Sequence, residues 1–239
     1  MGGGGGGFRR AEPGLPTAQD KPRYVADMFG RIARRYDLMN TLMTLGQDRA
    51  WRAAVAGEVP ANARRVLDVG TGTGKLANAV SGRLPGAEVV GVDFAVPMLQ
   101  AGQAPRPTAA DVLALPFADS TFDSVVSAFV VRNLADVQRG LAEQARVLRP
   151  GGRLVVLEIT PGPRRPLRGV FRLYFRGLVP RLGGLIAGDP TAYTYLPESA
   201  AAFLEPERLA DVLRGLGLSR IHVRRLALGS VAVVAGTTN

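Results

Sequence analysis

A glycine-rich loop that follows a short apolar run is the part of the sequence that most clearly predicts chemistry. The run spans residues 65–69, and the loop after it places glycines at Gly70, Gly72 and Gly74. Without Cβ atoms, such a loop lets a ligand lie against the backbone, and a helix that begins just after it offers unpaired N–H groups. The pattern predicts a nucleotide-type cofactor site at the end of a buried strand.

Two acidic residues near this loop distinguish between cofactor classes. Asp93 closes the next apolar run, where a carboxylate can accept both hydroxyl groups of a ribose. Asp68 lies two positions before the first glycine, where it would repel a pyrophosphate but attract the ammonium group of a methionine moiety. A dinucleotide fingerprint would also need its third glycine at Lys75. S-adenosylmethionine is therefore favoured over a nicotinamide cofactor.

A third acidic residue extends the predicted site along the same edge of the sheet. Asp111 follows a short segment that we expect to be the third strand, and its carboxylate can accept a hydrogen bond from an adenine amino group. Phe94 and Met98 can cover the ring with apolar surface. Ligands of open α/β sheets bind beyond the carboxyl ends of the strands, which is where these residues fall. We expect no bound metal.

The alternation of apolar runs and helical patterns predicts an α/β fold, a doubly wound and mostly parallel sheet with helices on both faces. Residues 21–58 are predicted to be helical, with a short, proline-rich crossover between Met98 and Asp111. We expect strands at residues 65–69, 88–92, 122–129 and 154–158, helices at 75–84 and 137–148, and a closing strand pair at 221–223 and 230–235. The turn Pro150-Gly151-Gly152 is predicted to end the second of these helices.

The 239 residues suit one α/β domain with additions. We expect a disordered glycine-rich tail at residues 1–20 and a single domain at 21–239, with an N-terminal helical cap at 21–60 and an insertion facing substrate or membrane at 161–205. The sequence has no cysteine, which excludes disulfides, thiolate nucleophiles and cysteine-held iron–sulfur clusters. With no apolar run long enough to cross a bilayer and no secretory signal, the expected location is cytoplasmic.

Several further stretches resemble the ubiquinone/menaquinone biosynthesis C-methyltransferase family, from about Val25 to Val234. They are Met28-Phe29-Gly30-Arg31-Ile32-Ala33-Arg34-Arg35-Tyr36-Asp37-Leu38-Met39-Asn40, Leu45-Gly46, Arg49, Trp51-Arg52, Leu115-Pro116-Phe117, Asp119, Arg132-Asn133, Arg146 to Leu154, Leu157-Glu158, Tyr174, Pro180, Gly183, Tyr193, Tyr195-Leu196 and Ser199. The resemblance implies a class I S-adenosylmethionine-dependent methyltransferase fold, with helices added before the sheet and before its last strands. It implies C-methylation of a prenylated quinol, most simply demethylmenaquinol to menaquinol, with a 2-polyprenyl benzoquinol or another small acceptor as alternatives.

Carried over by position, the family's cofactor contacts fall on Thr73, Asp93, Asp111 and Val112. One further contact, usually a serine, falls on Ala128, so that hydrogen bond is absent or shifted. The family often has histidine before Arg49, where this chain has Gln47 and Asp48, so a role for that histidine cannot be transferred. The expected cofactor site comprises Asp68, Gly70, Gly72, Thr73, Asp93, Phe94, Met98, Asp111, Val112 and Ala128.

A methyl acceptor of this kind needs a group that holds the quinol oxygen as the ring becomes nucleophilic. Arg132 and Asn133 lie just past a predicted strand end on the cofactor edge and are the first candidates, together with Tyr195. Tyr36, Asp37 and Asp48 are weaker candidates. The single histidine, His222, lies far along the chain from every motif and is expected to be structural or on the surface.

The formal net charge of +10 leaves two interpretations open, an anionic partner or arginines on solvated faces. Arginine recurs every fourth residue at Arg164, Arg168, Arg172 and Arg176, beside bulky apolar residues. This spacing fits an interfacial helix that touches anionic lipid on the inner face of the membrane, or a packed helix with one solvated face. An RNA methyltransferase or a nucleic-acid-binding module is disfavoured, because aromatic residues are only 6% and three acidic residues would have no purpose.

Overall fold

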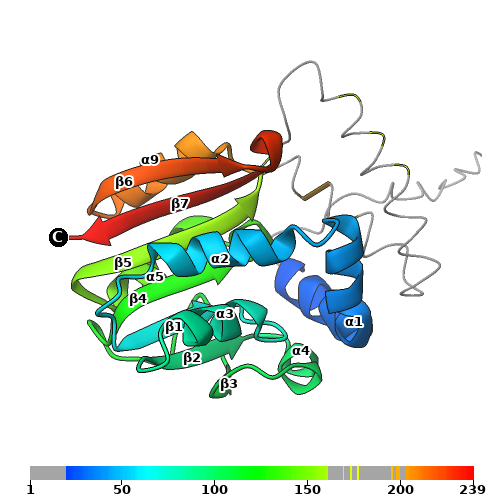
Figure 1. The fold of residues 1–239 in the computed structure, drawn as a ribbon, viewed down its shortest axis with the longest axis horizontal. Helices are drawn as coiled ribbons and strands as arrows, with labels where there is room; N and C mark the ends of the chain where they lie inside the picture. The colour runs from blue at the N-terminus through cyan, green and yellow to red at the C-terminus, as the bar shows by residue number, and fades with distance from the viewer. Residues whose placement is uncertain are drawn as a thin grey trace, which may run out of the picture.

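The computed structural model describes residues 20–160 and 203–239 and, between these ranges, residues 169, 173, 177, 195, 198 and 199. Its centre is a seven-stranded sheet with the strand order β3-β2-β1-β4-β5-β7-β6 (Figure 1). The strands are β1 (Arg65–Val69), β2 (Glu88–Asp93), β3 (Pro107–Ala109), β4 (Phe122–Ala128), β5 (Leu148–Ile159), β6 (Leu218–Leu226) and β7 (Val231–Thr238). The first five run parallel, whereas β7 runs antiparallel to both β5 and β6, which confirms the predicted mostly parallel sheet.

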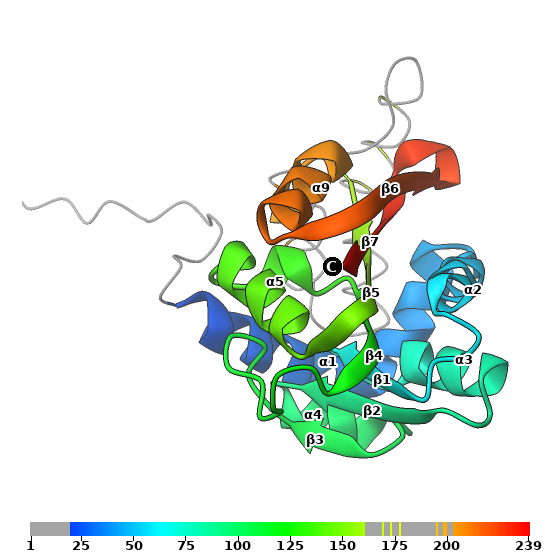
Figure 2. The ribbon, with the colours of Figure 1, turned by 90° about the vertical axis from the view of Figure 1, so that its left-hand side faces the viewer.

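Helices cover both faces of this sheet, as Figure 2 shows. The α-helices bounded in the described ranges are α1 (Lys21–Met43), α2 (Asp48–Glu58), α3 (Lys75–Arg83), α4 (Val96–Ala101), α5 (Val137–Arg146) and α9 (Pro206–Gly215). Helices α2 and α3 pack on one face, and α5 and α9 on the other. Parallel strands covered on both sides are nearly continuous in apolar residues, and β1 shows why: Val66 faces the first helix pair and Leu67 the second.

Helix α1 lies beside the carboxyl ends of the strands and packs against α4 (Figure 1). Its buried residues include Met28, Ile32 and Met39, which recur at helical spacing. The chain then turns at Leu45 and Gly46, both with positive φ, and enters α2. The predicted helical segment 21–58 is thus confirmed as two helices. Helix α4 has only six residues, as the short proline-rich crossover predicted.

The structure differs from the predicted element pattern in two places. Strand β5 begins at Leu148 and includes the Pro150-Gly151-Gly152 turn, which the sequence suggested would lie between a helix and a later strand. The pairing of β4 with β5 shifts register between Phe122 and Ser124, and Gly151 adopts a φ of 75°, so the strand passes through an irregularity that a proline and two glycines tolerate. Helix α9 was not predicted, although Pro206 opens it and Leu209 and Leu213 follow at helical spacing.

Other predictions fall on residues outside the described ranges. The predicted tail, residues 1–20, is described only at Asp20, and the arginines at positions 164, 168, 172 and 176 lie outside the described residues. The predicted insertion at 161–205 is described only at its six single residues and at 203–205. Among the residues that the structure describes, no helix is both long enough and apolar enough to cross a membrane.

Candidate functional site

A cleft lies at the carboxyl ends of β1, β2 and β4, between these strand ends and α1. Its polar wall comes from the glycine loop and from acidic residues close to the carboxyl ends of the strands, including Asp68, Asp93 and Asp111. Its apolar wall comes from α1 and from the segment after β4. The cleft therefore lies where the strand pattern predicted a ligand site.

The glycine loop is shaped by backbone that only glycine adopts without strain. Gly70, Gly72 and Gly74 have φ values of 65°, 56° and 87°. A Cβ added to Gly70 would lie 2.2 Å from a methyl carbon of Val130, and one added to Gly74 would lie 2.4 Å from the Ala104 Cα. The loop thus packs tightly against its own surroundings while keeping its open side free of side chains for a ligand.

Asp68 is the most deeply buried carboxylate of the cleft wall, with 1% of its surface exposed. Its Oδ2 accepts hydrogen bonds from the Thr71 hydroxyl at 2.7 Å and from the Ala77 backbone N–H at 3.0 Å. Its Oδ1 is buried without a partner among the described residues. Burial raises the pKa of Asp68 from 3.8 to about 7, against the opposing effect of these hydrogen bonds. A cationic donor in the cleft would satisfy Oδ1 and favour the ionised carboxylate.

Asp93 links the end of β2 to the glycine loop. Its Oδ2 accepts from the Gly72 backbone N–H at 2.8 Å, and its Oδ1 accepts from the Ala95 N–H at 2.8 Å. Burial raises the pKa of this carboxyl, although the backbone hydrogen bonds lower it. Each carboxylate oxygen keeps a second lone pair, so the group can still accept the two ribose hydroxyls that the sequence predicts.

The predicted adenine side lies along the same wall. Asp111 is exposed at the rim, where its Oδ1 accepts from the Leu113 N–H at 2.9 Å, and Val112 beside it is buried. Phe94 is 49% exposed, whereas Met98 is buried under the loop. Ala128 lines the cleft with no polar side-chain atom where the family usually has serine. The structure brings all the predicted cofactor residues to one cleft.

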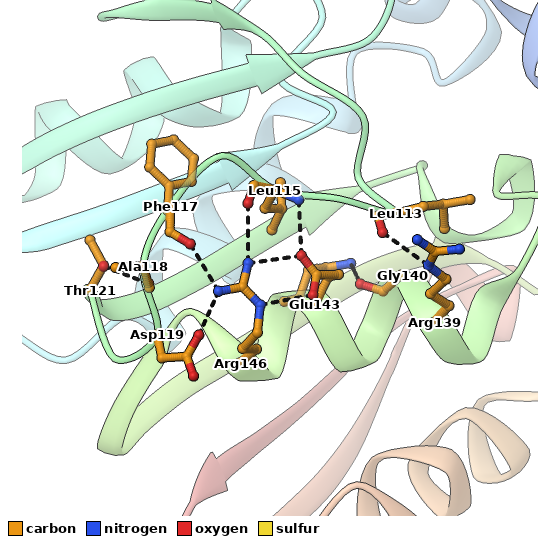
Figure 3. A network of polar contacts seen from close by, with 11 residues as sticks. Leu113, Leu115, Phe117, Ala118, Asp119, Thr121, Arg139, Gly140, Glu143 and Arg146 are labelled. Carbon is orange, nitrogen blue, oxygen red and sulfur yellow. Dashed lines mark hydrogen bonds and ion pairs between the residues drawn. The ribbon is translucent and has the colours of Figure 1, made fainter.

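The wall after Asp111 is held by a polar network that the sequence motifs did not explain (Figure 3). Arg146 donates to the carbonyls of Leu115 and Phe117 and pairs with Glu143 and Asp119. Glu143 in turn accepts the Leu115 N–H at 2.9 Å. The stretches shared with the family at 115–119 and at Arg146 therefore fix the loop that forms one side of the cleft.

Helix α1 is fastened across the cleft at both of its ends. Near its start, Lys21 donates to the carbonyls of Arg132 at 2.8 Å and Leu134 at 3.0 Å, and burial lowers its pKa. Nearer its end, Asp37 accepts from the Thr73 hydroxyl at 2.8 Å and lies 3.6 Å from the Lys75 ammonium. The predicted cofactor residue Thr73 is thus also a tie between the glycine loop and α1.

Arg132, Asn133 and Tyr195 are brought together at the end of β4, but they face the cleft differently. Asn133 lines the cleft, donates from Nδ2 to the Phe129 carbonyl at 3.1 Å and accepts from the Tyr195 hydroxyl at 3.2 Å. Arg132 does not line the cleft, because its guanidinium is buried behind the wall and bonded to Glu158 at 2.7 Å. Burial also raises the pKa of the Tyr195 phenol.

The weaker candidates Tyr36 and Asp48 differ in their position relative to the cleft. Tyr36 lines the cleft and packs edge-on against Phe29, whereas Asp48 is buried in an ion pair with Arg52. His222 lies away from the cleft on β6, 3.1 Å from a Glu58 oxygen. The expectation that this histidine is structural or on the surface is confirmed.

Sequence reasoning did not assign roles to Lys21, Arg52 or Glu158, all of which form or support the cleft. Arg52 and Glu158 stand within stretches that match the family, so a signal for them was present. The sequence alone does not show which residues these three side chains contact, because the contacted residues are distant in the chain or lie one helical turn away.

Comparison with known proteins assigns the family directly. Residues 17–238 match the ubiE/COQ5 methyltransferase family. The chain belongs to this family. It is 47% identical to a demethylmenaquinone methyltransferase of Deinococcus radiodurans over 94% of this chain and 96% of the relative, and 47% identical to one of Thermus thermophilus over 87% and 99%. A Desulfotalea psychrophila relative at 42% identity, over 87% of this chain and 88% of its own, is named ubiquinone/menaquinone biosynthesis C-methyltransferase.

A solved S-adenosylmethionine-dependent methyltransferase of Thermotoga maritima has the same fold, with a TM-score of 0.66 at 18% identity over 89% of this chain and 99% of its own. The chain is thus a class I methyltransferase that uses S-adenosylmethionine. Its cleft fits that cofactor, since Asp68 offers a buried oxygen to which no described residue donates and the glycine loop leaves an open side. When bound, the cofactor supplies an electrophilic methyl group on a sulfonium.

Proposed function

We propose that this chain methylates a ring carbon of a prenylated quinol and that its natural acceptor is demethylmenaquinol, which becomes menaquinol. We infer the class of acceptor from the hydrogen bond between Tyr195 and Asn133, which lies beside an otherwise apolar wall. An aromatic diol with a hydrocarbon tail matches a cleft of this kind. Two relatives at 47% identity, matched over nearly their whole length, bear the name demethylmenaquinone methyltransferase and support the naphthoquinol.

In this proposal, the residues at the end of β4 position the acceptor. The Asn133 amide has a second N–H that can donate to a quinol oxygen, and Tyr195 orients that amide through its oxygen. The buried Arg132–Glu158 ion pair contributes indirectly to positioning the acceptor. Glu158 also accepts from the Arg132 backbone N–H and so holds the turn that carries Asn133. The α1 residues Val25 and Phe29 keep water from the reacting centre.

The test is a turnover assay under reducing conditions with S-adenosylmethionine and detergent-dispersed demethylmenaquinol, read by mass spectrometry beside a 2-polyprenyl benzoquinol. We expect methylated naphthoquinone as the main product and none when the reductant is omitted, since only the quinol ring is nucleophilic. Preferred methylation of the benzoquinol would assign the chain to ubiquinone synthesis. Failure of both acceptors, with the cofactor still bound, would refute the quinol assignment.

We also propose that the protein meets its lipid substrate at an anionic membrane surface through the outer face of α1. Leu38 and Leu42 are 55% and 40% exposed on that face, and Leu45 just beyond the helix is 79% exposed. Arg35 and Arg31 are exposed one and two turns before Leu38 on the same stripe. Exposed leucines beside arginines match an interfacial helix, and a net charge of +10 favours anionic lipid.

Vesicle flotation tests this surface. We expect the protein to float with anionic vesicles and not with neutral ones, and the double variant Leu38→Asn/Leu42→Asn to lose most of this binding. Leu228→Asn is the matched control, because Leu228 is also 79% exposed but lies between β6 and β7. Equal flotation of the double variant and the wild type would show that these α1 leucines do not contribute to membrane binding.

A further inference from the structure

The residue that follows β4 has a backbone conformation that a phenylalanine rarely adopts. Phe129 has a φ of 63°, in the left-handed region, where the Cβ of a bulky residue crowds its own backbone. Of the non-glycine residues with a positive φ in the described ranges, Phe129 is the one that lines the cleft. Strain of this kind is kept only where the surrounding structure imposes it, and it collects at functional sites. The conformation of Phe129 therefore points to a role at the cleft.

Three neighbouring segments hold Phe129 in this conformation. Its backbone N–H donates to the Leu157 carbonyl of β5 at 2.8 Å. Its ring packs edge-on against Trp51 of α2, with 6.3 Å between the ring centroids. The Arg132 guanidinium, from the turn after β4, lies 5.8 Å from the centroid of the Phe129 ring, a distance at which a cation is attracted to an aromatic face. The backbone and the side chain of Phe129 are thus both fixed.

The carbonyl of Phe129 is the part that acts on the site. It accepts a hydrogen bond from Nδ2 of Asn133 at 3.1 Å, while Oδ1 of the same amide accepts from the Tyr195 hydroxyl at 3.2 Å. A carbonyl can only accept, so Nδ2 must be at the end of the amide that faces Phe129. A flipped amide would set two acceptor oxygens against each other. The Asn133 amide is therefore held at both ends, and one N–H remains for a ligand in the cleft.

We propose that Phe129 is a positioning residue for methyl transfer, because its left-handed backbone aims a carbonyl at Asn133 and so fixes where the free N–H of that amide points. A negative φ at Phe129 would redirect the chain that follows β4 and with it the amide. Phe129 reaches the methyl acceptor only through Asn133. The effect on catalysis rests on the proposed quinol chemistry, whereas the orientation of the amide is a property of the protein alone.

Nuclear magnetic resonance of the Asn133 side-chain amide tests this orientation without a methyl acceptor. The two Nδ2 protons are assigned by their loss in Asn133→Ala, and in the wild type we expect the proton bonded to Phe129 to exchange slowly with water. Phe129→Gly removes the ring and frees the backbone, so this protection should be lost. Phe129→Leu keeps apolar volume without the contacts to Trp51 and Arg132, so it should lose part of the protection. Phe203→Gly is the matched control, because Phe203 is a partly buried phenylalanine that packs on the α9 side of the sheet and does not line the cleft.

A double-mutant cycle tests the effect on the reaction. With demethylmenaquinol, Phe129→Gly should lower kcat by up to about 100-fold, the effect of misplacing a positioning group, and leave the affinity for S-adenosylhomocysteine at the wild-type value. In the Asn133→Ala background the same change should lower kcat no further, since Phe129 acts through that amide. Equal losses of kcat in the two backgrounds, or unchanged protection of the amide in both Phe129 variants, would overturn the proposal. If the wild type methylates neither quinol, the proposed acceptor is wrong, and the amide signals still decide whether Phe129 orients Asn133.

Discussion

At the scale of single residues, the two buried carboxylates of the cleft differ in how completely their oxygens are used. Both oxygens of Asp93 accept backbone N–H groups, whereas one oxygen of Asp68 has no donor in the described structure. The difference makes Asp93 a fixed part of the loop and Asp68 a group that costs stability until a cation binds.

Stability should therefore depend on pH through Asp68. Burial raises its pKa from 3.8 to about 7, so between these values the folded state holds a proton that the unfolded state has released. Stability then falls as pH rises through this window. We expect the melting temperature of ligand-free Asp68→Asn, relative to wild type, to be higher at pH 8 than at pH 5. A constant difference between the two pH values would show that Asp68 does not titrate in this range.

The Asn133 amide has a role that kinetics can isolate. Because it lines the cleft and is oriented by Tyr195, Asn133→Ala should lower kcat by about 100- to 1,000-fold, the effect of losing one group that stabilises charge in the transition state. S-adenosylhomocysteine affinity should remain that of the wild type, and Tyr195→Phe should show a smaller loss of the same kind. A matching loss of cofactor affinity would place Asn133 in the cofactor site instead.

Residue types and spacing were enough to predict Asp68, Asp93 and Asp111, because each lies close to the carboxyl end of a strand in the expected pattern. They were not enough to predict that the Arg132 guanidinium lies behind the cleft wall. That outcome depends on Glu158, which is 26 residues further along and becomes a neighbour only when β4 and β5 pair.

At the scale of elements, the glycine loop is the least tolerant part of the site. Gly70→Ala should abolish or greatly weaken cofactor binding and lower the melting temperature, because φ is positive and Val130 leaves no space for a Cβ. Gly82→Ala is the control, since Gly82 is exposed on α3 and nothing lies within 4 Å of the added carbon. That change should stabilise the protein by up to about 1 kcal/mol. Opposite signs for the two changes, measured by thermal unfolding, are the expected result.

Secondary structure was predicted correctly where the hydrophobic pattern was clear. It was predicted wrongly where residues that usually break a strand lie inside one. The short buried strand β1 was predicted correctly because most of its residues are apolar and a glycine loop follows. Strand β5 was shortened in prediction because Pro150, Gly151 and Gly152 are breakers in isolation, whereas pairing with β4 and β7 carries the strand through them. Helix α9 was overlooked because its pattern follows a segment treated as one insertion.

At the scale of the whole molecule, the cofactor site occupies one edge, and the sheet extends well away from it through β7 and β6 (Figure 1). Ligand binding should therefore protect the structure unevenly. We expect S-adenosylhomocysteine to slow hydrogen exchange in α1 and in the loop from Gly70 to Gly74, with little change in α9. Uniform protection would instead indicate that binding acts on global unfolding.

Among the described residues, the hydrogen bonds that join α1 to the rest of the cleft include those of Lys21 at its start and Asp37 beyond its middle. With the helix in place, α1 side chains such as Val25 and Phe29 would also line the space occupied by the spent cofactor. We expect release of the spent cofactor to require these contacts to open, a step that is separate from the chemistry of methyl transfer. If that opening is slower than the chemistry, the maximal rate will depend on the contacts of Lys21 and Asp37 rather than on methyl transfer.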